Sequence, residues 1–323
     1  MGKVDLQSTQ YFNDSSRYAD LWNAVVYDGK EVISPDALMP IDTTSTVATP
    51  HGSKKITNDN AMQWQGKCLR ILVQENQNYI DYRMVLRNML TESMMYNKQY
   101  KEKARRSKKA NNLKDDELLS GISKYEKFTP VITLVVNLSD KKWDAATNLY
   151  ELFDIDEEPE IKNMISNYHL NIFDYHDYDN FDDFKTELRQ VFSFLRYSED
   201  RDGMKKILEA DREQFEAMDE ETAQLIEVLT KTKGRRQGGT VNMCKAFDDH
   251  YNCGKEEGMK AGREAGVKEG IKAGREAALQ IGIQNLVSTI KRLTNKMDDA
   301  IDSIMLEYGT DREEAERTVR KYW

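Results

Sequence analysis

The chain has 323 residues, of which 32% are charged, and its formal net charge at pH 7 is -9. This length accommodates about two domains, and either half is long enough to bury a core. The acidic balance excludes a protein coated in basic charge for non-specific nucleic-acid binding, although it is compatible with a local basic groove.

The lack of a recognisable targeting signal and the cysteine usage both favour a cytoplasmic protein. The N-terminal MGKVDLQSTQ lacks the apolar segment of a signal peptide, and Leu6 breaks the myristoylation pattern. No apolar run approaches the roughly 20 residues of a membrane span, so we expect no membrane partner. The three cysteines fit no zinc motif, which favours a reduced compartment.

Residues 11–27 are predicted to form an amphipathic helix that packs on a sheet. Asp14 and Ser15 suit its N-cap, and apolar residues from Tyr18 onward recur at helical spacing. Asp20 lies beside this apolar stripe, where a solvated charge or an ion pair is the simplest role. Residues 36–57 are rich in Ser, Thr and Pro, which predicts a loop with one short strand.

The stretch that follows is predicted to form a strand with a charged end. Residues 67–73 carry apolar side chains at every second position, and Glu75 and Gln77 continue on the same face. Upstream, Gly66 and the Asn-Asp-Asn cluster around Asp59 predict a hairpin that brings Asp59 close to Glu75. Two carboxylates and an amide would then meet at one sheet edge, which suits a divalent cation.

Residues 80–100 are predicted to be helical, with Arg87 and Lys98 spaced to share a face. Arg87 could bind a phosphate there or act as an ion-pair partner. Between residues 98 and 114, eight basic residues accompany one acid, which suits either a grip on a DNA backbone or a flexible linker. The residues predicted to contact DNA are Lys101, Lys103, Arg105, Arg106, Lys108 and Lys109.

Further along, the pattern is that of an α/β core closed by helices. KFTPVITLVVNL predicts a central strand, KKWDAATNLYELF a loop and a helix, and YHLNIFD another strand. From residue 181 onward the apolar spacing is helical.

The C-terminal region contains glycines at every fourth position. In a helix, six such glycines cost about 5 kcal/mol relative to alanine, unless close approach of another helix offsets this cost. The alternatives are a long charged helix that mediates self-association and a frayed monomeric tail. Beyond it, Gly309 is predicted to end one helix and Thr310 to cap the next. The glycines are Gly254, Gly258, Gly262, Gly266, Gly270 and Gly274.

Several of these segments, in this order, resemble one known family. The chain resembles the PD-(D/E)XK nuclease family transposases, which are related to the recombination-promoting nucleases. The resemblance covers nearly the whole chain. It rests on RYADLWNAVVYDGKEVI, QENQNYIDYRMVLRNMLTESMMYNKQ, KFTPVITLVVNLSDKKWDAATNLYELF, FKTELRQVFSFLRYS and GGTVNMCKAFDDHYNCGKEEG.

The resemblance implies a restriction-endonuclease-like α/β fold: a mixed sheet flanked by helices, followed by an all-helical C-terminal region. We expect a nuclease-like core over residues 1–200, a helical closing layer and linker over 201–240, and a helical tail over 241–323. It also implies that Asp59 and Glu75 bind Mg²⁺ or Mn²⁺, with Gln77 replacing the usual lysine of the motif. By the same resemblance, Asp20 is a candidate third ligand.

The leading hypothesis is metal-dependent hydrolysis of DNA. Gln77 would orient a water but lacks the charge of lysine, so Lys67, Arg87 or Lys98 would have to supply it. The alternative is a catalytically inactive DNA-binding or self-assembling protein that retains the fold. That alternative is favoured by Asn58 and Asn60, which flank Asp59 where the family usually has a basic and an apolar residue.

Overall fold

The protein is a mixed α/β chain made of two compact units, Met1–Asp248 and Asp249–Trp323. The computed structural model describes residues 2–42, 44–49, 52–56, 58–66, 68–111, 113–155 and 158–323. Of residues 3, 45–49, 52–56, 246, 248–257 and 261 it describes the backbone alone. Lys67, one predicted source of positive charge, lies outside the described residues.

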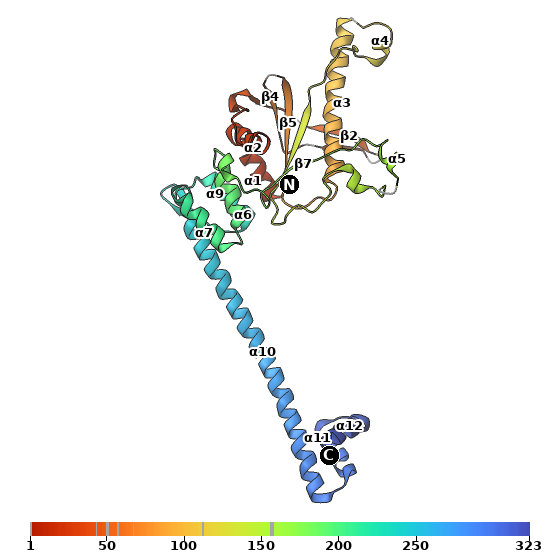
Figure 1. The fold of residues 1–323 in the computed structure, drawn as a ribbon, viewed down its shortest axis with the longest axis vertical. Helices are drawn as coiled ribbons and strands as arrows, with labels where there is room; N and C mark the ends of the chain where they lie inside the picture. The colour runs from red at the N-terminus through yellow and green to blue at the C-terminus, as the bar shows by residue number, and fades with distance from the viewer. Residues whose placement is uncertain are drawn as a thin grey trace. The chain divides into compact units, whose positions relative to one another are not determined.

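The first unit begins with two α-helices and five consecutive strands, after which helices and strands follow in mixed order (Figure 1). The strands are β1 (Leu38–Pro40), β2 (Ser45–Thr49), β3 (Gly52–Ile56), β4 (Asn60–Gln65), β5 (Leu69–Gln77), β6 (Val131–Asn137), β7 (Asn171–Asp174), β8 (Arg235–Gln237) and β9 (Thr240–Asn242). The α-helices are α1 (Lys3–Tyr11), α2 (Ser15–Tyr27), α3 (Met84–Ala110), α4 (Asp116–Ser120), α5 (Pro159–Lys162), α6 (Leu188–Tyr197), α7 (Arg201–Ala210), α8 (Arg212–Glu216) and α9 (Glu220–Thr230). The 3₁₀ turns are η1 (Pro35–Ala37), η2 (Leu149–Leu152) and η3 (Phe181–Asp183).

The main sheet has five strands in the order β1-β4-β5-β6-β7. Strands β1, β4 and β5 pair antiparallel, whereas β5, β6 and β7 pair parallel. The predicted hairpin is therefore confirmed as β4 and β5, and the predicted central strand is β6, with a parallel neighbour on each side. Parallel strands need a crossover connection, and α3 supplies it between β5 and β6.

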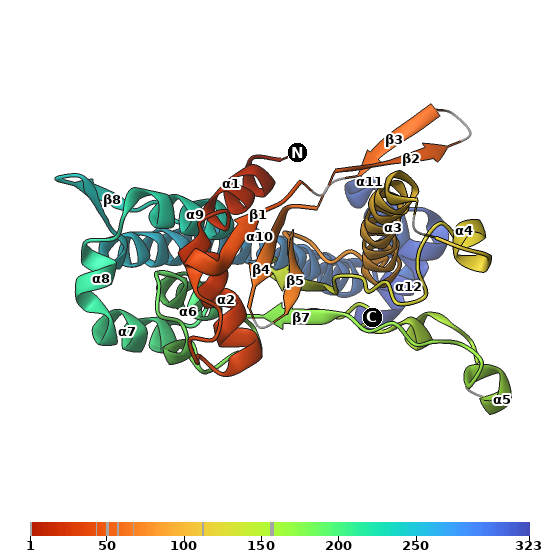
Figure 2. The same cartoon turned by 90° about the horizontal axis from the view of Figure 1, so that it is seen from above.

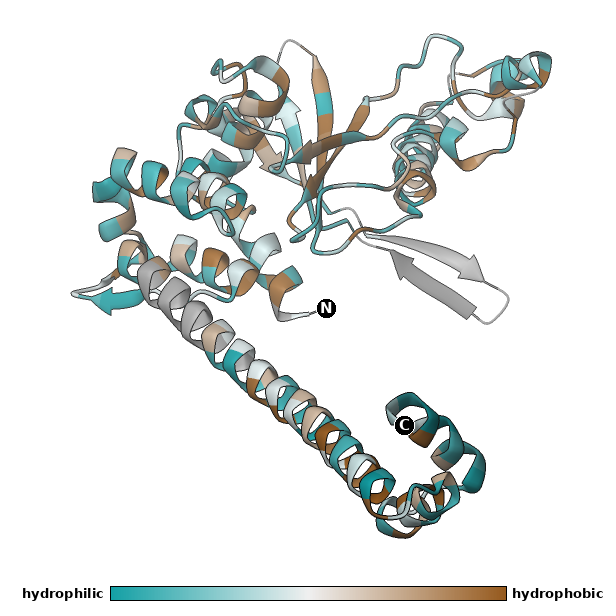
Figure 3. Ribbon diagram, turned by 60° about the horizontal axis from the view of Figure 1, so that its bottom comes forward, coloured by the Kyte–Doolittle hydropathy of each residue, from teal (hydrophilic) through white to brown (hydrophobic). Residues whose placement is uncertain are grey.

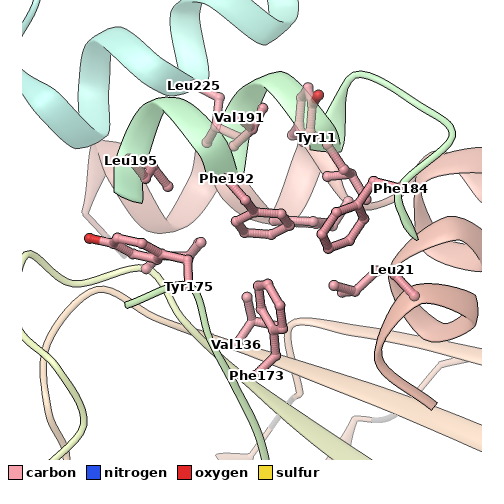
Figure 4. Close-up of a cluster of buried hydrophobic side chains, with 14 of the residues drawn as sticks. Tyr11, Leu21, Val136, Phe173, Tyr175, Phe184, Val191, Phe192, Leu195 and Leu225 are labelled. Carbon is pink, nitrogen blue, oxygen red and sulfur yellow. The ribbon is translucent and has the colours of Figure 1, made fainter. Parts of the chain in front are cut away.

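Each face of the sheet is covered by helices (Figures 1 and 2). On one face, α1, α2 and α6 enclose the larger core, in which Phe173, Phe184 and Phe192 are buried together (Figure 4). On the other face lies α3, whose Met95 packs with Val73 and its neighbours in a smaller cluster. Alternate residues of β5 therefore face different helical layers, as a period of two requires.

Several local predictions need correction. The basic stretch that suited a flexible linker is helical as far as Ala110, because α3 runs on without a break. The helix predicted within KKWDAATNLYELF is only the 3₁₀ turn Leu149–Leu152, and the short helix α5 follows it before β7. Residues 36–57 contain β1 and the hairpin of β2 and β3, where one short strand was expected. The helix predicted over 11–27 is confirmed as α2, with Asp14 accepting two amide hydrogen bonds as its N-cap.

The predicted long C-terminal helix is confirmed. Helix α10 (Met243–Thr294) spans 52 residues, and in the second unit α11 (Met297–Tyr308) and α12 (Arg312–Tyr322) follow it. A small core around Val287 and Ile304 joins the last turns of α10 to these helices. Gly309 ends α11 as expected, but the cap of α12 is Asp311 and not Thr310.

Helix α10 carries both hydrophobic and hydrophilic residues. Figure 3 shows hydrophobic positions among hydrophilic ones over the described part of α10. None of the helices in the described ranges is both long and apolar enough to cross a membrane.

Candidate functional site

The hairpin register brings two predicted acids together at the end of β5. Asn60 pairs with Gln74 in the antiparallel ladder, so the next positions outward are Asp59 and Glu75. The Oδ2 atom of Asp59 accepts a hydrogen bond of 2.9 Å from the amide of Asn76. The two carboxylates thus lie at the carboxyl end of β5, at the edge where we expected them.

Arg87, in the first turn of α3, reaches into this acidic cluster. Its Nη2 atom lies 2.7 Å from Oε2 of Glu75, and its Nη1 donates to Oε1 of Gln77 at 3.2 Å. The Glu75 side chain is only 2% exposed, whereas that of Arg87 is 36% exposed. Arg87 therefore contacts a buried carboxylate from a partly solvated position.

The electrostatics of the pair follow from burial. Desolvation, and after it the charge of Asp59, raise the pKa of Glu75 to about 8. Arg87 and a hydrogen bond from the side chain of Asn58 act in the opposite direction. Burial likewise raises the pKa of Asp59, against the hydrogen bond from Asn76 and the charge of Arg87. Two neighbouring carboxylates that resist ionisation together are well suited to bind a cation.

Gln77 lies two residues beyond Glu75, and both side chains contact the same arginine. It is buried, and its side-chain oxygen faces Arg87. The common face predicted from the alternation of β5 is therefore confirmed.

The cluster also contains two acids that the sequence patterns did not indicate. Asp81, between β5 and α3, accepts hydrogen bonds from Arg83 at 3.0 and 3.2 Å, and Nη1 of Arg87 lies 3.5 Å from it. Although desolvation opposes the shift, Arg83 and Arg87 lower the pKa of Asp81. An acid just before a helix is an ordinary N-terminal signal, so Asp81 could have been noticed.

Asp5 on α1 is the second missed acid. Its Oδ1 accepts a hydrogen bond of 2.6 Å from Asn78, and its charge raises the pKa of Asp59. No local pattern predicts this contact, because about seventy residues separate the partners.

Asp20 has other partners. Its carboxylate accepts hydrogen bonds from the amides of Lys185 and Thr186 and from the Thr186 hydroxyl, which fixes the chain just before α6. Among the described residues, no contact joins Asp20 to Glu75. These contacts support the structural interpretation of Asp20 over its prediction as a third ligand.

Lys98 is also separate from the acidic cluster. It lies 11 residues beyond Arg87 on α3, which corresponds to about 16 Å along a helix. Its ammonium group donates to the backbone oxygen of Asp42 at 3.0 Å. Lys98 therefore does not supply the positive charge that Gln77 lacks, whereas Arg87 contacts Gln77 directly.

The predicted DNA-contacting residues occupy the last turns of α3, and one of them differs from the rest. Lys103 forms an ion pair of 2.6 Å with Glu126. In the described part of the chain, the other five have no ion-pair partner and are exposed. They are Lys101, Arg105, Arg106, Lys108 and Lys109.

The donor set at the end of β5 fits a hard divalent cation. Asp59, Glu75 and Gln77 each offer oxygen ligands, and Mg²⁺ commonly uses one or two carboxylates together with waters and substrate phosphates. Within the described ranges, no group of three histidine, cysteine, aspartate or glutamate side chains is arranged to hold a metal ion. Any cation here would therefore need water or substrate oxygens as well.

Known proteins do not identify the chain. No protein family, curated protein or solved structure matches it.

Proposed function

We propose that the protein is a metal-dependent DNA endonuclease of the PD-(D/E)XK type, with a restriction-endonuclease-like fold. The observation that carries the proposal is the apposition of Asp59 and Glu75 across the β4–β5 ladder, with Gln77 on the same face as Glu75. Asp59 and Glu75 would hold Mg²⁺ or Mn²⁺. When bound, such a cation lowers the pKa of a coordinated water and neutralises charge on a phosphate.

Three side chains, those of Glu75, Gln77 and Arg87, would assist this chemistry. Glu75 is buried, so its charge acts through a medium that screens it less than water does. Gln77 has a side-chain amide that can hold a water by hydrogen bonding, while its oxygen already contacts Arg87. Arg87 supplies the positive charge that a glutamine in place of lysine lacks, and its exposed part can reach a phosphate.

The geometry of α3 supports DNA as the substrate. Lys98, Lys101, Arg105 and Lys108 follow Arg87 by 11, 14, 18 and 21 residues, which are close to whole helical turns. They therefore form a basic stripe along one side of α3, about 32 Å long from Arg87 to Lys108. A duplex carries phosphates along its whole length, so one that lies on this stripe would have its backbone near Glu75 at one end.

Nicking of supercoiled plasmid with Mg²⁺ or Mn²⁺ tests the activity. We expect Glu75→Gln to lower the rate about 100-fold, because it removes the buried negative charge that would hold the cation. Glu151→Gln is the matched control, since it makes the same chemical change at an exposed carboxylate held by Thr147. Equal rates in wild type and Glu75→Gln, or no metal-dependent nicking, would contradict the proposal.

Duplex binding in EDTA tests the basic stripe separately from cleavage. Neutralising Lys101, Arg105 and Lys108 to glutamine should weaken binding to a duplex of about 20 base pairs and reduce the salt slope by about 0.9 per lost phosphate contact. Lys103→Gln removes a charge on the same helix that is already paired with Glu126, and should leave the slope unchanged. A slope that is the same in the triple variant as in wild type would remove the stripe from the DNA-binding surface.

A second candidate function is self-assembly through the tail, with or without catalysis. It is favoured by one observation on α10: nothing lies within 4 Å of a Cβ built on five of its glycines. Five glycines cost a helix about 4 to 5 kcal/mol relative to alanine, and no neighbour in the described chain uses the space they leave. A second copy of α10 could approach closely along this stripe. The five are Gly258, Gly262, Gly266, Gly270 and Gly274.

Sedimentation of the full chain tests the self-assembly proposal. We expect an oligomer that dissociates when Gly262, Gly266 and Gly270 are all changed to alanine, because added methyl groups keep two helices apart. Alanine at Lys260, Lys268 and Lys272, on the opposite side of α10, is the control and should leave the mass unchanged. A wild-type chain that sediments as a monomer would refute self-assembly.

A further inference from the structure

The guanidinium of Arg87 already occupies the acidic site that the proposed function assigns to a metal ion. It lies 2.7 Å from Glu75, 3.2 Å from Gln77 and 3.5 Å from Asp81, measured to their side-chain oxygens. Glu75 and Asp81 are both buried. Arg87 is the positively charged side chain that pairs with the Glu75 carboxylate. A buried carboxylate without such a partner is strongly unfavourable.

A divalent cation and a guanidinium repel each other when they share one carboxylate. Binding of a cation at Glu75 is therefore most favourable when Arg87 moves away from Oε2. The structure contains a second acceptor for it, because Asp81 lies next to its Nη1 atom at the start of the same helix. Asp81 also binds Arg83, which is 78% exposed and contacts no other acid of the cluster.

We propose that Arg87 is the resident counter-ion of the site and competes with the divalent cation for Glu75, moving onto Asp81 when the cation binds. Arg87 is thus a positioning residue that sets the affinity for the cation. This inference rests on the proposed metal site but is separate from the hydrolysis assigned to it. It would also place Arg87 near the rim of the site, where a substrate phosphate arrives with the cation.

Titration of the full chain with Mn²⁺ by calorimetry tests the competition without measuring cleavage. We expect Arg87→Met to tighten Mn²⁺ binding roughly tenfold, a typical size for coupling between two ligands of one site. Arg212→Met is the matched control: it removes the same charge from an ion pair with Glu216, an acid outside the cluster. We expect its Mn²⁺ affinity to remain close to that of wild type.

Asp81→Asn provides a second test that leaves the pair of Glu75 and Arg87 intact. Since it removes the charge that receives Arg87, we expect weaker Mn²⁺ binding than in wild type. This result does not depend on whether Arg87→Met folds. A purely structural role for Arg87 would not produce tighter binding when it is removed.

The outcomes distinguish this inference from the proposed function. If wild type binds Mn²⁺ and Arg87→Met binds it no more tightly, the competition is refuted and the metal site stands. If Arg87→Met does not fold, unchanged or tighter binding in Asp81→Asn refutes the competition. If none of the proteins binds Mn²⁺, the inference and the metal site are both refuted.

Discussion

The site depends on one constraint, which is that Glu75 carries a carboxylate into the interior of the sheet. Burial of a charge is costly unless a partner neutralises it, and Arg87 from α3 is that partner. Asp59 adds a second carboxylate from the position just before β4 and makes ionisation of Glu75 harder still. Groups with strongly shifted pKa values gather at functional sites, which is why this cluster is the candidate site.

The fold explains why these groups meet. Strand β5 is the middle strand of the sheet, where the antiparallel half meets the parallel half: β4 pairs with it on one side and β6 on the other. The antiparallel partner brings Asp59 opposite Glu75 through a short hairpin. The parallel partner requires a crossover, and that crossover is α3, whose first turn presents Arg87. Side chains from the β4–β5 hairpin and from the α3 crossover therefore meet at the carboxyl end of β5.

The parts of the site that depend on local sequence could be predicted, and those that depend on distant contacts could not. Alternation along β5 predicted that Glu75 and Gln77 share a face, and the turn residues before β4 predicted the position of Asp59. Asp5 was missed because its contact with Asn78 is set by how α1 packs on the sheet, which no periodicity records.

Contacts between residues that are distant in sequence also explain where the structure differs from the predictions. Asp20 has the spacing of a helix residue beside a core, but its partners come from the chain before α6, far away in sequence. The basic end of α3 has the composition of a linker. The helix nevertheless continues, because the Lys, Arg, Glu and Ala residues there are good helix formers. Tyr96 and Gln99 also bond the preceding turns to Val131 and Thr129. Tertiary contacts and local propensity together decide such segments.

The most direct test of the account is the pH dependence of the unfolding free energy of wild type and Glu75→Gln, measured with urea in EDTA. The Glu75 carboxyl has an ordinary pKa of 4.5 and a folded-state pKa of about 8, so the folded state holds its proton more tightly over that interval. The stabilising contribution of the protonated group is complete below pH 4.5 and is lost as the pH rises through 8. We therefore expect wild type to lose stability relative to Glu75→Gln over this range. A stability difference between the two proteins that does not change with pH would contradict a Glu75 carboxyl whose pKa is raised by burial.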